Sequence, residues 1–327
     1  MSLLDPHGRR INYLRLSVTD RCNLRCIYCR PAVGVQPGGG YSDILSYEDL
    51  YCLARAAVAI GVEKIRVTGG EPLVRNGIIG FLERLAAIPG LERLVLTTNG
   101  LLLKEMAADL RIAGVESLNI SIDSLHPETF SRITRGGDIR NVLNGIAAAE
   151  SAGFSHIKIN VVVMRGVNDN EVANFAALTL DRPYMVRFIE YMPTLLKDGW
   201  QSLTVPGEEL IQELSSRYTL EKVVKENMAG PASYYQIAGA AGQIGVITPV
   251  SCHFCHECNR IRITSSGFAK SCLFADNTTD LRPYLEQNDH RALQGALIRV
   301  IENKPERHTI GKDSDRAVQF AMSEIGG

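Results

Sequence analysis

The sequence lacks several features that would assign a protein to a class at once. No run within its 327 residues approaches 18 apolar residues, so a membrane-spanning helix is not expected. Residues 1–6 lack the apolar segment of a signal peptide, and we expect a cytoplasmic protein. The net charge is only −1, which gives no global field favouring nucleic acid or a membrane as partner. Internal repeats and low-complexity linkers are also missing, apart from a glycine-rich connection at residues 37–40.

What the sequence contains is an alternation of β-rich and helical segments from residue 11 to about residue 192. Strands are predicted at residues 12–18, 64–68, 93–97, 117–122, 156–163 and 185–190. Helices are predicted at residues 47–60, 78–87, 102–111, 140–152 and 171–180. The order predicts an α/β fold with a parallel sheet, either a partial (β/α)6 barrel or an open doubly wound sheet.

The ends of the first helix carry recognisable signals. Ser46 is the expected N-cap, with Asp49 three residues later, and Gly61 is the expected stop. Beyond residue 193 the alternation breaks. Residues 206–240 are predicted to form a helix with irregular connections, followed by two short β-rich runs at 243–247 and 260–264 and a helical tail.

Six of the eight cysteines fall in two groups, and in a reducing compartment metal ligation is a better interpretation than disulfides. Cys22, Cys26 and Cys29 follow the first predicted strand in a C-x₃-C-x₂-C spacing. Three thiolates are one short of what a [4Fe–4S] cluster normally takes, so one iron would stay open to a small molecule. A structural zinc site, which usually closes with four ligands, is the alternative.

The second group is Cys255, Cys258 and Cys272, with Cys252 close by. Four thiols could form a closed zinc site, and His253 or His256 could replace one of them. Spacing alone leaves zinc and a second cluster equally possible.

Basic residues on predicted strands form the next set. Strand alternation places Lys64 and Arg66 on one face, and it does the same for Arg260 and Arg262. A charge facing a packed interior is costly unless it is paired. The set therefore favours a bound polyphosphate over a salt-bridged scaffold, and it comprises Arg15, Lys64, Arg66, Lys158, Arg187, Arg260 and Arg262.

The strand ends also carry polar groups, where parallel sheets gather ligands. The second strand runs into Thr68-Gly69-Gly70-Glu71-Pro72, whose paired glycines permit a close approach of main chain to ligand. Thr97 ends the third strand and Ser121 lies in the fourth. Together they favour a site along one rim.

The first cysteine loop and the glycine motif resemble those of the radical S-adenosylmethionine (SAM) superfamily. With the second cysteine group and Arg260-Ile261-Arg262 added, nearly the whole chain, from Arg15 to Gly326-Gly327, resembles the GTP 3′,8-cyclase family. The resemblance implies a partial TIM-like (β/α)6 barrel over residues 1–230. It implies a C-terminal region over 231–327 with a second cluster and a Gly-Gly tail that reaches into the active site.

That family's activity is the first step of molybdenum cofactor biosynthesis. A 5′-deoxyadenosyl radical from SAM removes a hydrogen from C3′ of GTP, and C3′ then attacks C8 of guanine. The product is (8S)-3′,8-cyclo-7,8-dihydroguanosine 5′-triphosphate.

Residue by residue, the resemblance implies two [4Fe–4S] clusters, one on Cys22, Cys26 and Cys29 and one on Cys255, Cys258 and Cys272. It implies that SAM is bound by Tyr28, Gly70, Ser121 and Met192. It implies that GTP is bound by Arg15, Arg66, Thr97, Lys158, Arg260, Ile261 and Arg262. We take the residues that clamp the triphosphate during catalysis to be Lys64, Arg66, Arg187, Arg260 and Arg262.

Partners follow from the same resemblance. We expect GTP as substrate, a flavodoxin- or ferredoxin-like electron donor, a homodimer, and a downstream cyclic pyranopterin monophosphate synthase. A radical SAM enzyme acting on a peptide and a zinc-stabilised binding module are the competing hypotheses.

Overall fold

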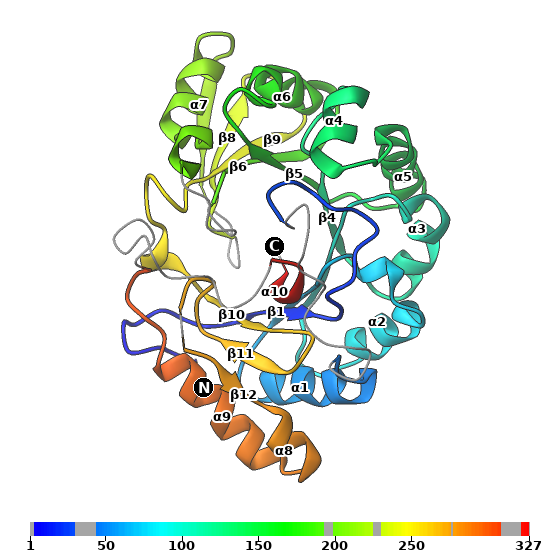
Figure 1. Ribbon diagram of the computed structural model, residues 1–327, viewed down its shortest axis with the longest axis vertical. Helices are drawn as coiled ribbons and strands as arrows, with labels where there is room; N and C mark the ends of the chain where they lie inside the picture. Colours follow the sequence, from blue (N-terminus) through cyan, green and yellow to red (C-terminus); the bar gives the residue numbers. More distant parts are fainter. Residues whose placement is uncertain are drawn as a thin grey trace.

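Six parallel strands form the centre of one sheet, in the order in which they occur in the chain. The computed structural model describes residues 3–29, 44–192, 199–224, 230–275, 277–308 and 322–326. The central strands are β1 (Tyr13–Ser17), β2 (Lys64–Thr68), β3 (Arg93–Thr98), β4 (Ser117–Ser121), β5 (Ile157–Val163) and β6 (Met185–Glu190). A doubly wound sheet reverses its strand order near the middle. The consecutive order and the curvature around a central space (Figure 1) therefore confirm the partial barrel.

Helices cover the outside of the curved sheet (Figure 1). They are α1 (Tyr47–Ala59), α2 (Ile78–Ala86), α3 (Leu103–Ile112), α4 (Pro127–Thr134), α5 (Ile139–Ser151) and α6 (Val172–Asp181). The predicted capping box of α1 is present, and Gly61 follows the helix with φ 114°. Helix α4 was not predicted, because its eight residues give too short a periodic pattern. Short 3₁₀ helices are η2 (Pro72–Val74), η3 (Asp169–Glu171), η4 (Trp200–Leu203) and η5 (Cys255–Glu257).

The C-terminal third of the chain extends the same sheet at both edges. Strand β9 (Gln243–Ile247) pairs in parallel with β6, and β8 (Ser233–Ile237) and β7 (Leu220–Val223) follow it as antiparallel neighbours. At the other edge β10 (Arg260–Ile263) pairs in parallel with β1. Beyond β10 lie β11 (Phe268–Lys270) and β12 (Thr279–Asp280).

Two parts of the prediction for this region need revision. Residues 206–240 hold α7 (Gly207–Ser215) and the strands β7 and β8, where irregular connections were expected after the helix. All twelve described strands belong to one sheet, with β12 and β7 at its edges, so the predicted domain boundary at residue 230 does not separate two sheets. That boundary stays a prediction. The predicted helical tail is present as α8 (Arg282–Glu286) and α9 (His290–Glu302), and α9 packs against α1.

The hydrophobic core lies between the sheet and the outer helices. Leu14 and Leu16 of β1 and Ile65 and Val67 of β2 belong to it, while the residues between them point inward. The short helix α10 (Met322–Ile325) lies inside the ring of strands, next to β1 (Figure 1). Within the described ranges, no helix is both long enough and apolar enough to cross a membrane.

Glu190, the last residue of β6, fixes the chain at the carboxyl edge of the sheet. Its carboxylate is fully buried and accepts hydrogen bonds from the N–H groups of Gly207 (2.8 Å), Val250 (3.0 Å) and Ser251 (3.0 Å). The hydroxyl of Ser251 donates to the same carboxylate. One side chain therefore joins β6 to the start of α7 and to the segment that leads into the second cysteine group.

We expect Glu190→Ala to lower the free energy of unfolding by about 3 kcal/mol, because four donors around this fully buried carboxylate lose their acceptor. Urea unfolding of the purified protein measures this change. The control is Glu209→Ala, which removes an exposed ion pair with Arg165 and should cost at most about 1 kcal/mol. Equal losses in the two variants would contradict this role of Glu190.

Candidate active site

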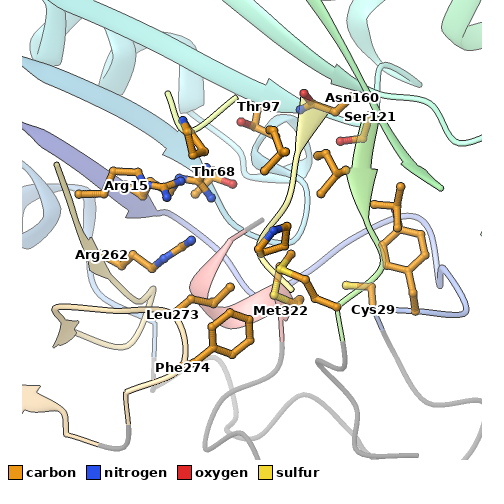
Figure 2. A pocket seen from close by; sticks show the side chains of 18 of the residues that line it. Arg15, Cys29, Thr68, Thr97, Ser121, Asn160, Arg262, Leu273, Phe274 and Met322 are labelled. Carbon is orange, nitrogen blue, oxygen red and sulfur yellow. The ribbon is translucent and has the colours of Figure 1, made fainter. Parts of the chain in front are cut away.

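A pocket inside the curved sheet is lined by both cysteine groups and by residues at the carboxyl ends of the central strands. Figure 2 shows Arg15 and Arg262 on one side of this pocket and Cys29 on the other, with Thr97 and Ser121 along the rim. The six predicted ligands Cys22, Cys26, Cys29, Cys255, Cys258 and Cys272 all line it. Two groups more than 220 residues apart in the sequence therefore face one space.

The glycine motif after β2 supports the first cysteine loop. The N–H of Gly70 donates to the carbonyl of Thr19 (2.7 Å) and the N–H of Glu71 donates to the carbonyl of Arg21 (2.7 Å). A Cβ on Gly70 would lie 2.2 Å from the Arg21 oxygen, so only glycine fits. The close approach predicted for these glycines thus includes an approach to the cysteine loop itself.

Glu71 links this motif to the end of β3. Its buried carboxylate accepts from the Thr98 hydroxyl (2.8 Å) and the N–H groups of Asn99 (2.6 Å) and Leu73 (3.0 Å). Burial raises the pKa of Glu71 to about 7, although these donors favour the charged form. Asn99 in turn places its amide nitrogen 3.7 Å from the Cys22 sulfur.

The thiols of the first group need a cation between them in order to ionise together. Burial raises the pKa of Cys26 well above its ordinary value, and the charges of Asp123, Cys29 and Cys22 raise it further. The sulfur of Cys22 already accepts a hydrogen bond from the main-chain N–H of Leu24, with 3.4 Å between nitrogen and sulfur. A positively charged iron cluster would remove the repulsion, so this donor set fits the predicted centre.

The second group has a different charge environment. Burial disfavours the thiolate of Cys258, but Arg260 and Lys304 outweigh burial and lower its pKa to about 6. The guanidinium of Arg260 lies 3.8 Å from the Cys258 sulfur. Cys252, by contrast, is exposed and does not line the pocket. The arrangement favours three thiol ligands here, as an open cluster requires.

Within the described ranges, no three His, Cys, Asp or Glu side chains form a site for a single metal ion. A four-iron cluster is larger than an ion and takes one thiolate per iron, so each group need only surround a common space.

All four residues predicted to bind SAM line the pocket, and they are Tyr28, Gly70, Ser121 and Met192. The hydroxyl of Tyr28 donates to Asp123 (2.7 Å), whose other oxygen accepts from the N–H of Val162 (2.8 Å). Burial raises the pKa of Asp123 to about 6, against the effect of these two donors. Asp123 was not among the predicted site residues, although its position two residues after Ser121 was a signal that could have identified it.

The predicted cations divide into two layers. Arg15, Arg260 and Arg262 line the pocket, as does Thr97. Lys64, Arg66, Arg187 and Lys158 are on the same inner face but do not line the pocket. The side chain of Ile261 points the other way and is fully buried in the core, so its predicted contact with GTP stays a prediction for its main chain alone.

Among the residues described, the ion pairs include none of Arg15, Arg66, Lys158, Arg187, Arg260 and Arg262. Burial and, to a smaller extent, nearby cations lower the pKa of Arg15 to about 9 and that of Lys158 to about 6. In the described part of the chain, Arg15 Nε, Arg66 Nε, Arg187 Nε and the Thr97 hydroxyl are buried without a hydrogen-bond partner. Orphaned buried donors, and arginines without a carboxylate partner among the described residues, indicate an anionic ligand.

Tyr13 lies among these cations. Its ring centroid is 4.8 Å from Lys64 Nζ and 5.4 Å from the Arg66 guanidinium carbon, and the side chain is buried. Burial alone would raise the pKa of Tyr13, but Arg66, Arg15, Lys64 and Arg260 lower it to about 7. Its phenolate supplies negative charge beside arginines that have no carboxylate partner among the described residues. Sequence reasoning, which treated Tyr13 as an apolar strand residue, missed it.

Comparison with known proteins identifies the family. The model described as "Radical SAM superfamily" matches residues 16–179, and "Molybdenum Cofactor Synthesis C" matches residues 184–310. A GTP 3′,8-cyclase of Geobacter sulfurreducens is 63% identical over 327 residues, covering 100% of both chains. A GTP 3′,8-cyclase of Peptoclostridium acidaminophilum is 45% identical, covering 99% of this chain and 98% of the other. The chain belongs to the GTP 3′,8-cyclase family of radical SAM enzymes.

A solved structure supports the fold of this family member. Streptococcus suis SuiB bound to S-adenosylmethionine aligns with a TM-score of 0.60 at 14% identity, covering 91% of this chain and 68% of that one. At this identity the likeness concerns the fold alone.

The phenolate of Tyr13 predicts a pH-dependent stability. A pKa that is lower in the folded protein than in the unfolded chain adds stability at high pH, and this is lost as the pH falls through about 7. We therefore expect the thermal midpoint of the wild type to rise relative to that of Tyr13→Phe between pH 6 and pH 9, values chosen on either side of that pKa. Anaerobic calorimetry at both values measures it.

The control is Tyr47→Phe. Burial raises the pKa of Tyr47 to about 12 despite Arg75, so this tyrosine stays neutral over the whole range. A difference for Tyr13→Phe that is the same at both pH values, as expected for Tyr47→Phe, would show that Tyr13 does not ionise.

Proposed function

We propose that this protein converts GTP to (8S)-3′,8-cyclo-7,8-dihydroguanosine 5′-triphosphate, using SAM, in the first step of molybdenum cofactor biosynthesis. One observation carries the proposal beyond family membership. Two groups of three cysteines face a single pocket whose wall holds cations for which the described residues supply no carboxylate partner. A radical generated at one group could therefore act on an anionic substrate held at the other.

Cys22, Cys26 and Cys29 would hold the first [4Fe–4S] cluster, and Cys255, Cys258 and Cys272 the second. A bound cluster with one open iron supplies the electron that splits SAM into methionine and a 5′-deoxyadenosyl radical. The protein's own part is to ligate, orient and exclude water.

Orientation of SAM would come from the rim beside the first group. Tyr28 is held by Asp123, so its ring and main chain have a fixed position next to Cys29. Ser121 is the last residue of β4, while Gly70 follows β2 and Met192 follows β6, so the predicted contacts gather at the carboxyl ends of several strands. In parallel α/β folds ligands bind at this edge of the sheet.

The triphosphate of GTP would lie against Arg15, Arg260 and Arg262. Their guanidinium groups can bind phosphate oxygens through paired N–H donors. Lys64, Arg66 and Arg187 would add charge from the second layer, and Lys158 would do so once the bound anion raises its pKa from about 6. Fixing the triphosphate holds the ribose in place, and this lowers the entropic barrier of the reaction.

The C-terminal tail approaches the same cations. Arg262 donates from Nη1 to the carbonyl of Gly326 (2.8 Å), and a Cβ on Gly326 would lie 2.2 Å from Cγ2 of Thr68. Only glycine can occupy this position, with its φ of 76°. Gly327 lies outside the described residues. We propose that the tail covers the substrate and is needed for cyclisation rather than for folding.

The remaining partners belong to the same proposal. We propose a flavodoxin- or ferredoxin-like reductant, replaceable by dithionite in vitro, a homodimer, and transfer of product to a cyclic pyranopterin monophosphate synthase. The proposed location is the cytoplasm. The proposed division is a radical SAM partial barrel with the first cluster over residues 1–230 and a region with the second cluster and the Gly-Gly tail over residues 231–327.

The test of this function is direct. Anaerobically purified protein should contain about eight irons, as two four-iron clusters require, and little zinc. With SAM, GTP and dithionite it should form equimolar 5′-deoxyadenosine and cyclised GTP. Two closed zinc sites and no product would support the binding-module hypothesis instead.

Cys26→Ser tests the first cluster. One ligand is removed from only one group, so we expect iron to fall by about half and 5′-deoxyadenosine formation to stop. Iron analysis and chromatography measure both. Full iron with continued cleavage of SAM would contradict the assignment.

Arg262→Ala tests the anion site. Loss of a charge-assisted contact to a buried anion should weaken GTP binding by about 2–3 kcal/mol, while cleavage of SAM without substrate persists. Equilibrium binding under anaerobic conditions measures the affinity.

Two controls separate the possible causes. Arg165→Ala removes an exposed arginine paired with Glu209 and should leave GTP affinity unchanged. Deletion of Gly326 and Gly327 keeps Arg262, so it should retain the clusters and SAM binding and lose cyclisation. Unchanged GTP affinity in Arg262→Ala would assign this arginine to the tail contact alone.

A further inference from the structure

Residues 3–10, before the first strand, form a tight turn that buries an ion pair. Leu4 and Arg10 form an antiparallel bridge, and the N–H of Gly8 donates to the carbonyl of Asp5 (3.0 Å). The turn brings Asp5 and Arg9 together, with Arg9 Nε 2.5 Å from Asp5 Oδ2 and side-chain exposures of 5% for Arg9 and 0% for Asp5. The other Asp5 oxygen accepts from the N–H of Arg9 (2.9 Å). The position of the guanidinium is therefore fixed from behind.

The outer nitrogens of Arg9 reach three main-chain carbonyls in distant parts of the sequence. Nη1 donates to Cys255 (2.7 Å) and Glu306 (3.0 Å), and Nη2 donates to Pro305 (2.7 Å). Cys255 begins η5, and residues 305–306 follow α9. One planar group thus joins the N-terminal turn, the second cysteine group and the segment after the last long helix.

Lys304 continues this attachment. It is buried, and its Nζ donates to the carbonyls of Arg260 (2.8 Å) and Ser271 (2.5 Å). Asn259 is held as well, because its carbonyl accepts from the N–H of Tyr13 (3.2 Å). The main chain at or beside each of the three cysteines is therefore held by a buried donor.

Arg9 does not line the pocket, so any effect on the site must pass through the main chain it holds. The bonds need a fork of several N–H groups in one plane, which arginine has and lysine lacks. A surface turn does not require a buried arginine, since the desolvation of a charge is costly. The cost is offset here by the ion pair with Asp5 and by the three carbonyls that accept from the guanidinium.

We propose that Arg9, held by Asp5, is a positioning residue that keeps Cys255 in register with Cys258 and Cys272, so that the second group can bind its cluster. The proposal rests on the proposed function, because it takes the second group to be a cluster site. It assigns no role in binding SAM or GTP to Arg9.

The test compares two variants of neighbouring residues. Arg9→Lys keeps the charge and removes the fork. Arg10→Lys is the matched control, since Arg10 adjoins it but is exposed and pairs with Glu63. Both are purified anaerobically, and their iron and EPR spectra are compared with those of Cys26→Ser, which defines the signal of the second cluster.

In Arg9→Lys we expect iron to fall from about eight to about four, with loss of the second signal and retention of SAM cleavage. Arg10→Lys should keep both signals. If Arg9→Lys folds poorly, Asp5→Asn, which leaves the guanidinium but removes its orienting carboxylate, should show the same selective loss.

A second measurement does not depend on the identity of the metal. In apoprotein, mass spectrometry follows alkylation of each cysteine. In Arg9→Lys, Cys255, Cys258 and Cys272 should react on the order of tenfold faster than in wild type, as local opening increases, while Cys22, Cys26 and Cys29 keep their rates. If the wild type holds no second cluster, the proposed function fails while this assay still tests Arg9.

Two results would overturn the proposal. Arg9→Lys could keep full iron, both signals and wild-type alkylation rates, which would make the buried network irrelevant to the cysteines. It could instead lose iron and gain reactivity equally at both groups, which would make Arg9 a general folding residue.

Discussion

The active site is built around buried cations that lie side by side on the inner face of a curved sheet, where they repel one another. Strand register sets this arrangement: Arg15 of β1 lies between Arg66 of β2 and Arg262 of β10, its partners on either side. In most parallel barrels this space is filled by branched apolar side chains. Here the apolar residues of the same strands all point outward, and like charges occupy the inside. The large apolar core on the outer face stabilises the sheet around this cluster, and Tyr13, whose pKa the four cations lower to about 7, can compensate part of the charge.

Much of this could be predicted from the sequence, because the relevant signals are local. Strand alternation placed Lys64 with Arg66 and Arg260 with Arg262 on one face, and the structure confirms both pairs. Six central strands and the capping box of α1 were also recovered. The site residues named from the resemblance mostly line one pocket.

What could not be predicted depends on contacts between distant segments. Strands β7, β8, β11 and β12 are short and lie toward the edges of the sheet, where burial on one side gives a weak periodic signal. Glu71 has its role only because the ends of β2 and β3 lie side by side. Arg9 has its role through contacts with Cys255 and Glu306, which lie 246 and 297 positions further along the chain. The low pKa of Tyr13 needs four cations from three strands. No window of sequence contains such information.

A single strand, β1, connects the first cysteine group with the arginines of the C-terminal region. The family models divide the chain near residue 180, but β10 returns to pair with β1 on the side opposite β2. Strand β1 therefore carries Arg15 beside the C-terminal arginines and runs, five residues after Ser17, into Cys22 of the first group. A rigid strand between the two sites fixes the distance from a radical source to a held substrate, and a flexible linker between two modules could not. The described strands of the C-terminal region thus extend both edges of the sheet, which stays open between β12 and β7. Arg9 of the N-terminal turn and Lys304 after α9 both hold the main chain of the second cysteine group.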